Sequence, residues 1–264
     1  MTLADDGSPT AGERSSQPQG EYRRGQLLGA LGVFAIATAI CSALWQLRRV
    51  LPFIQKYLHA LIAFVFLYLP TTLVSRAGEH YDDYGLTHRP IKRSLIYFAL
   101  ISAVVFPLFV LGLFYFYWTT CRLVYAGKVS LAVYVRACRR FVGSWRYLSF
   151  RLPANFGELA AAQVIVVALP EEYFFRGYLQ TKLERVWPVQ RRFAGGSVGV
   201  AVIATSLLFA LCHVLVDFNP LRFAVFFPSL LFGWLRQATG AILAPVLFHA
   251  SCNLVSEVLH VMFF

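Results

Sequence analysis

Charged residues are scarce in this chain. Only 14% of its 264 residues are charged and 58% are hydrophobic, whereas soluble domains carry about 25% charged residues. This composition excludes an ordinary soluble domain and predicts a multi-pass integral membrane protein. In a soluble protein the formal net charge of +11 would suggest nucleic-acid binding. Here the basic residues lie between apolar segments, where they suit anionic lipid headgroups, so we expect the lipid bilayer as a partner and no nucleic acid.

The chain also lacks the cysteine and histidine spacings of common structural or metal sites. Its five cysteines form no CxxC pair or disulfide framework, and no HExxH motif is present. We therefore expect the cysteines within apolar segments to act as small packing residues. A cleavable signal peptide is not visible either, because residues 1–25 are polar and the first apolar run is too long for one. Residues 1–25 are predicted to form a disordered tail.

Apolar runs of spanning length, which takes about 20 residues, recur along the rest of the chain. The seven candidates are Gln26–Leu47, Tyr57–Val74, Leu95–Trp118, Phe156–Tyr178, Val198–Val216, Leu221–Leu235 and Ala241–Phe264. No alternating barrel pattern or internal repeat is present, so the sequence predicts an all-α bundle of about seven transmembrane helices, within a range of six to eight. Basic residues fall on both sides of this arrangement and leave its orientation open.

Between the third and fourth runs lies a basic, aromatic connector, for which we expect an amphipathic helix at the membrane interface. It contains Arg136, Arg139, Arg140, Arg146 and Arg151 together with Trp145 and Tyr147. We divide the chain into the tail at 1–25, transmembrane helices and connector at 26–150, and a transmembrane core at 151–264.

The fourth run carries Glu171, Glu172 and Arg176. A charged side chain near the bilayer centre costs roughly 2.5–3.5 kcal/mol on insertion scales, so such residues usually face an interior and have a function. Residues four apart share a helix face, which predicts an ion pair between Glu172 and Arg176 and leaves Glu171 pointing elsewhere. The alternative is a charged helix end, since further charged residues follow closely.

Two other apolar runs each carry a polar motif. One is Phe209-Ala-Leu-Cys-His213. Asp217, four residues after it, either orients the histidine or lies in the following loop. The other is His249-Ala-Ser-Cys-Asn253, whose spacing places the imidazole and the carboxamide on one helix face. Taken singly, the first is as readily a packing histidine and the second a hydrogen-bonded contact between helices.

Together these side chains form a complete set for hydrolysis. Glu171 can take a proton from water, with His213 holding that water, while His249 and Asn253 donate hydrogen bonds to the oxyanion of a tetrahedral intermediate. No serine or cysteine nucleophile is needed. We expect Cys212 and Cys252 to point away from the site, because each is adjacent in sequence to a site residue. Substrate hydrolysis inside the membrane is the function that this set predicts.

These motifs resemble those of the CAAX-protease and bacteriocin-processing family of intramembrane endopeptidases. The matches are Glu171-Glu172-Tyr-Phe-Phe-Arg176, Phe209-Ala-Leu-Cys-His213 and His249-Ala-Ser-Cys-Asn253, and Tyr84-Gly85-Leu86 resembles the segment that precedes them in the family. The resemblance covers roughly 156–258. It implies Glu171 and His213 as the water-activating pair, His249 and Asn253 as the oxyanion hole, and Glu172, Arg176 and Phe209 as supporting residues.

The resemblance also implies a membrane-associated protein or peptide substrate, cut near its C-terminus. The block 169–180 is similar to the bacterial, myxosortase-like branch linked to C-terminal sorting tags, which places the chain in a bacterial plasma membrane. We expect no cofactor, because a carboxamide is a poor zinc ligand, although zinc remains an alternative. The competing functions are a non-catalytic membrane immunity or scaffold protein and a proton-relaying transporter.

Overall fold

The computed structural model describes residues 19–87, 90–145, 149–188 and 193–264. Within these ranges the chain is helical, and its extended pairing is one isolated bridge between Phe193 and Gly196. The main helices are α1 (Gln19–Leu47), α2 (Pro52–Arg76), α3 (Ile91–Tyr125), α4 (Ala132–Cys138), α8 (Val200–Asp217), α9 (Phe226–Thr239) and α10 (Leu243–Phe263). The predicted all-α fold is confirmed.

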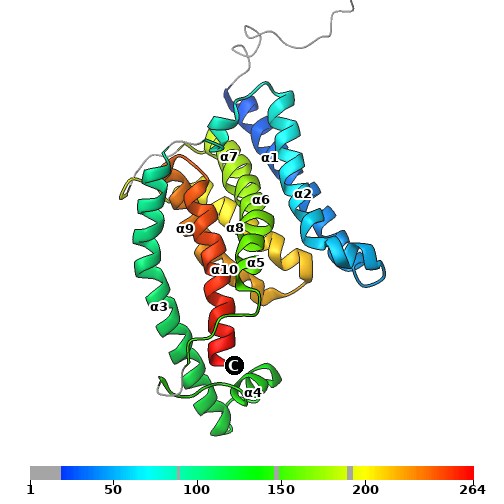
Figure 1. Cartoon of the computed structure of the whole chain (residues 1–264). Helices are drawn as coiled ribbons and strands as arrows, with labels where there is room; N and C mark the ends of the chain where they lie inside the picture. Colours follow the sequence, from blue (N-terminus) through cyan, green and yellow to red (C-terminus); the bar gives the residue numbers. More distant parts are fainter. Residues whose placement is uncertain (1–18, 88–89, 146–148, 189–192) are drawn as a thin grey trace, which may run out of the picture.

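A composite helix occupies the middle of the bundle (Figure 1). It consists of α5 (Phe156–Ala162), η4 (Gln163–Ala168), α6 (Leu169–Glu172), η5 (Tyr173–Leu179) and α7 (Gln180–Val186). Helices α1 and α2 lie on one side of it and α9 and α10 on the other, with α3 outside α10 (Figure 1). Each of the seven predicted spans corresponds to a helix of this bundle. Five of the described helices are long and apolar enough to cross a membrane.

The composite helix departs from the uninterrupted helix that the sequence predicts. Both η4 and η5 are π-helical, so the four residues of α6 that carry the glutamates lie between two widened turns. Pro170 has no backbone N–H to donate and disturbs regular α-helical pairing at this point. Short π-helical segments are rare and occur frequently at functional sites.

Two predictions, one for the N-terminal tail and one for the connector, are wrong in part. Residues 19–25 are helical and begin α1, so the predicted tail is too long, while its residues 1–18 lie outside the described residues. The predicted amphipathic helix of the connector is only the seven-residue α4, and Arg146 and Tyr147 lie outside the described residues. The connector is instead held by a disulfide between Cys121 and Cys138, a pairing that the sequence did not indicate.

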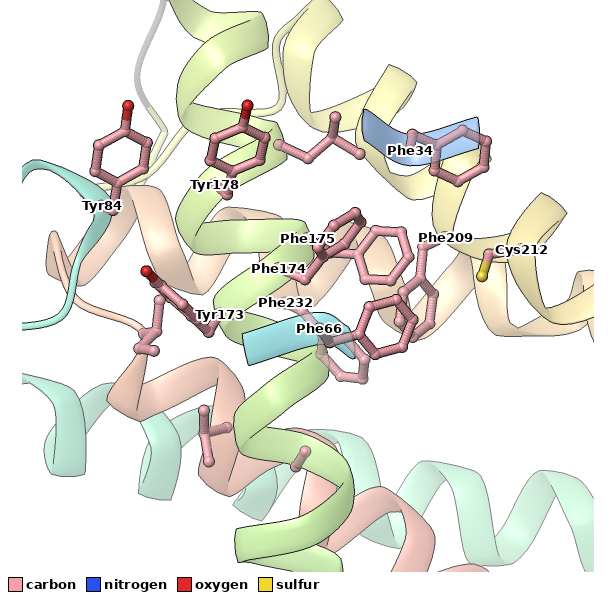
Figure 2. Packing of buried hydrophobic residues seen from close by; sticks show 14 of the residues in the cluster. Phe34, Phe66, Tyr84, Tyr173, Phe174, Phe175, Tyr178, Phe209, Cys212 and Phe232 are labelled. Carbon is pink, nitrogen blue, oxygen red and sulfur yellow. The ribbon is translucent and has the colours of Figure 1, made fainter. Parts of the chain in front are cut away.

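Aromatic side chains fill the core around the composite helix (Figure 2). Phe174 and Phe175 are fully buried and contact Phe66 of α2, with ring centroids 4.9 and 5.6 Å apart. The backbone of Tyr84 reaches the same helix at Gly177, where an added Cβ would lie 2.9 Å from the Tyr84 carbonyl oxygen. Gly177 therefore permits close packing of the segment that precedes α3.

That segment is fixed by charge at the end of α7. Glu79 pairs with Lys182 at 2.8 Å and with Arg185 at 2.7 Å, and Tyr84 donates a hydrogen bond to the same carboxylate. Burial alone raises the pKa of Glu79, but the hydrogen bonds from Arg185, Lys182 and Tyr84 outweigh it and lower the pKa to about 2. The next residue, Gly85, has φ +77°, and its carbonyl accepts a hydrogen bond from the Ile242 amide at 3.1 Å.

Candidate active site

The predicted site residues line one cavity of about 590 Å³. Its walls come from the last turns of α1 and α8, the middle turns of α2, the composite helix, α9 and α10. The cavity brings together all four side chains predicted to act in hydrolysis, and Phe209 also lines it. These are Glu171, His213, His249 and Asn253.

Glu171 lies midway between the two imidazole rings. Its Oε2 atom is 3.9 Å from Nε2 of His213 and 3.9 Å from Nε2 of His249. These separations are too long for direct hydrogen bonds and suit a bridging water. The same oxygen is buried and has no hydrogen-bond partner among the described residues. The carboxylate is thus available to a water that enters the cavity.

The orientation of His213 is set by its own helix. Nδ1 lies 2.9 Å from the carbonyl oxygen of Phe209. A carbonyl can only accept, so Nδ1 donates a proton in this contact and Nε2 faces Glu171. The Phe209 ring also packs against the imidazole, with centroids 4.4 Å apart. Asp217, four residues further on, ends α8 and pairs with Arg222 at 3.0 Å. Of the two alternatives for Asp217, the structure therefore supports a place at the helix end rather than contact with His213.

His249 has a charged partner instead. Its Nδ1 lies 2.8 Å from Oε1 of Glu172, and the other oxygen of Glu172 lies 3.2 Å from Nε of Arg176. The predicted ion pair between Glu172 and Arg176 is present, and both side chains are 0% exposed. Nη2 of Arg176 also donates to Oγ of Ser229 at 2.8 Å. The sequence did not link Glu172 to His249, because the contact joins residues 77 positions apart.

The guanidinium group of Arg176 also packs against aromatic faces. The Arg176 guanidinium carbon lies 4.5 Å from the ring centroid of Phe209 and 5.1 Å from that of Phe232. Phe232 in turn stacks on His249 at 4.9 Å. Burying an arginine is costly unless it is paired and hydrogen-bonded, and these contacts supply its compensation. Arg176 thereby fixes Glu172, which fixes the ring of His249.

Asn253 is anchored by a residue to which the sequence analysis gave no role. Its Nδ2 donates to Oε1 of Gln163 at 2.8 Å. One amide proton of Asn253 then remains to serve a ligand. Gln163 also lines the cavity. The signal that could have found it is its place two helical turns before Glu171, as a polar residue in an apolar run.

The cysteines near the site are placed differently from the prediction. Cys212 and Cys252 line the cavity together with Cys41, rather than pointing away from it. Adjacency in sequence rotates a side chain by only about 100° on a helix, which is not enough to leave a cavity walled by six helices. Cys41 and Cys212 are buried, free thiols.

A zinc site in an enzyme needs about three protein ligands around the ion. In the part of the chain that the structure describes, no group of three or more His, Cys, Asp or Glu side chains is arranged to hold one. The remaining polar group of the site is the Asn253 carboxamide, which is a poor zinc ligand. The site therefore presents a carboxylate, two imidazoles and an amide to a ligand.

Comparison with known proteins gives one match. Residues 154–255 match the family model described as type II CAAX prenyl endopeptidase Rce1-like. No curated protein and no solved structure matches the chain significantly. The matched range contains all three motifs and every residue of the site described above except the lining residues of α1 and α2 and, on α10, Ser256 and Glu257. Residues 154–255 of this integral membrane protein are thus similar to the type II CAAX prenyl endopeptidases.

Proposed function

We propose that the chain is a glutamic-type intramembrane endopeptidase, in which Glu171 activates the attacking water. The observation that carries the proposal is the placement of one Glu171 oxygen 3.9 Å from Nε2 of both His213 and His249 within a single cavity. A water held between Glu171 and His213 would lose its proton to this pair as it attacks the scissile carbonyl. The same pair then returns the proton to the leaving amine.

The partners of the two Nδ1 atoms support different roles for the two histidines. A carboxylate at Nδ1 stabilises a doubly protonated ring, and His249 has Glu172 at that position. His213 has only the neutral carbonyl of Phe209 there. His249 is therefore assigned to donate from Nε2 to the oxyanion, together with the free amide proton of Asn253. His213 is assigned to hold the water.

The proposed substrate is a membrane-associated protein or peptide, cut near its C-terminus, in a bacterial plasma membrane. The family match supports a protein substrate in general. The finer assignment draws on the similarity of the block 169–180 to the branch that processes C-terminal sorting tags. In a strain carrying Glu171→Gln, a substrate with a C-terminal anchor should accumulate uncut. Normal processing in that strain would remove this assignment.

The direct test uses the full chain purified in detergent and a panel of C-terminal anchor peptides, with products identified by mass spectrometry. We expect one internal cleavage that persists in the presence of a metal chelator. Loss of cleavage on chelation, with recovery on adding zinc, would replace the glutamic mechanism by a metal-dependent one. Absence of cleavage across the panel, with Glu171→Gln also leaving processing in cells intact, would favour the scaffold alternative.

A further inference from the structure

Three exposed residues that line the cavity, His59, Arg222 and Glu257, lie toward the end of the bundle where α2 begins and α8 and α10 end, so the cavity opens toward that end. Trp45 near the end of α1, His59 in the first half of α2 and Asp217 at the end of α8 line the cavity on this side. Arg222, which follows α8 and also lines the cavity, is 50% exposed. The opposite end carries the start of α1, the end of α7 and the segment around Glu79, where Lys182 and Arg185 pair with it.

The disulfide lies at the end where the cavity opens. Cys121 is in the last turns of α3, and Cys138 ends α4. Just beyond α4, the Val142 amide donates to the carbonyl oxygen of Phe263 at 2.9 Å, which ties the connector to the end of α10. Because α10 runs from His249 in the site toward this end, α4 and the C-terminus lie at the same end of the bundle (Figure 1), and so do the disulfide and the exposed residues that line the cavity.

A disulfide carries information about compartment. Disulfides form and persist in oxidising surroundings, such as the bacterial periplasm, and are rare where thiols are kept reduced. Charge does not supply this information here, because basic residues lie at both ends of the bundle, for example Arg93 at one and Arg140 at the other. The disulfide therefore indicates which end of the bundle faces away from the cytoplasm, a choice that the positive-inside rule does not make for this chain.

We propose that the cavity opens on the oxidising, extracytoplasmic face of the membrane. Its substrates are then proteins whose scissile segment has already crossed the bilayer, rather than proteins that approach from the reducing cytosol. In forming the bond, the two thiols lose two protons and two electrons to the disulfide of an exported thiol–disulfide oxidoreductase, which becomes a dithiol. The orientation stands on the disulfide alone, whereas the substrate class rests also on the proposed protease activity.

A matched pair of single-cysteine additions tests the orientation. Ser75→Cys places an exposed thiol at the end of α2, opposite the mouth, and Ser130→Cys places one in the connector beside α4. Wild type sets the baseline, since its disulfide cysteines do not react with maleimides and two of its free thiols are buried. Spheroplasts expressing each full-length variant are treated with a membrane-impermeant maleimide before and after permeabilisation.

Ser130→Cys should be labelled in intact spheroplasts and Ser75→Cys only after permeabilisation. Mass spectrometry of wild type alkylated in its membranes should find Cys121 and Cys138 linked. The reverse labelling pattern, or free thiols at both positions, would overturn the proposal.

A second measurement separates orientation from activity. An impermeant peptide that the purified protein cleaves should be cut by intact spheroplasts and left uncut by inside-out vesicles. Cleavage by inside-out vesicles alone would overturn the proposed substrate class. If no peptide is cleaved in any preparation while labelling follows the expected pattern, the orientation is established and the protease proposal fails. Glu171→Gln should label as wild type does, because the disulfide does not depend on catalysis.

Discussion

Neutralising Glu172 should destabilise the fold far more than removing any surface charge. Its carboxylate is fully buried and contacts both Arg176 at 3.2 Å and Nδ1 of His249 at 2.8 Å. Glu172→Gln keeps the shape and the hydrogen-bond acceptor for His249 but leaves the guanidinium of Arg176 with Ser229 as its hydrogen-bond partner among the described residues. Breaking a buried ion pair by removing one partner costs about 3–5 kcal/mol, because the remaining charge is uncompensated.

The assay is thermal or denaturant unfolding of the full chain purified in detergent. Asp217→Asn is the matched control, because it removes a carboxylate whose partner Arg222 is half exposed, and such pairs contribute about 0–1 kcal/mol. Adding Arg176→Met to Glu172→Gln should recover much of the loss, since both buried charges are then gone. If Glu172→Gln were no less stable than Asp217→Asn, the buried pair would not hold the site together as described.

Three further outcomes follow from single contacts. Asn253→Ala should lower kcat by about a hundredfold or more through loss of an oxyanion donor. Gln163→Ala should lower kcat by less, because it only frees the Asn253 amide. Steady-state kinetics on a cleaved peptide would measure both variants, and equal losses would contradict the assigned roles. Gly177→Val should cost about 1–3 kcal/mol by overpacking against the Tyr84 carbonyl, seen as a lower Tm. The contribution of Glu79 should be complete above its unfolded pKa of about 4.3 and be lost as pH falls toward its folded pKa of about 2, so Glu79→Gln should remove this part of the pH dependence of Tm.

Local patterns in the sequence predicted much of the fold and the site. Apolar runs located the helices because spanning length is fixed by the bilayer. The spacing of Glu172 and Arg176 predicted their ion pair because residues four apart share a helix face. The convergence of Glu171 with His213 and His249 followed from the cost of leaving polar groups in lipid, which favours interior placement.

Features that depend on tertiary contacts were not predictable in this way. The π-helical turns on either side of Glu171 change which residues lie on the same face of the helix. The apolar pattern of the sequence does not predict them. The contact between Glu172 and His249 and the anchoring of Asn253 by Gln163 both join distant segments. The pairing of Cys121 with Cys138 depends on a turn that brings α4 back onto α3, which spacing alone does not specify.

The most direct test of the account compares two carboxylates that line the same cavity. Glu171 lies between the imidazoles, whereas Glu257 lines the cavity one turn beyond Asn253. Glu171→Gln should lower kcat on the order of a hundredfold to ten-thousandfold, the usual contribution of a general base, in protein of normal Tm. Glu257→Gln should cleave the same peptide at close to the wild-type rate. Retention of activity by Glu171→Gln, or an equal loss in both variants, would contradict a water activated by Glu171.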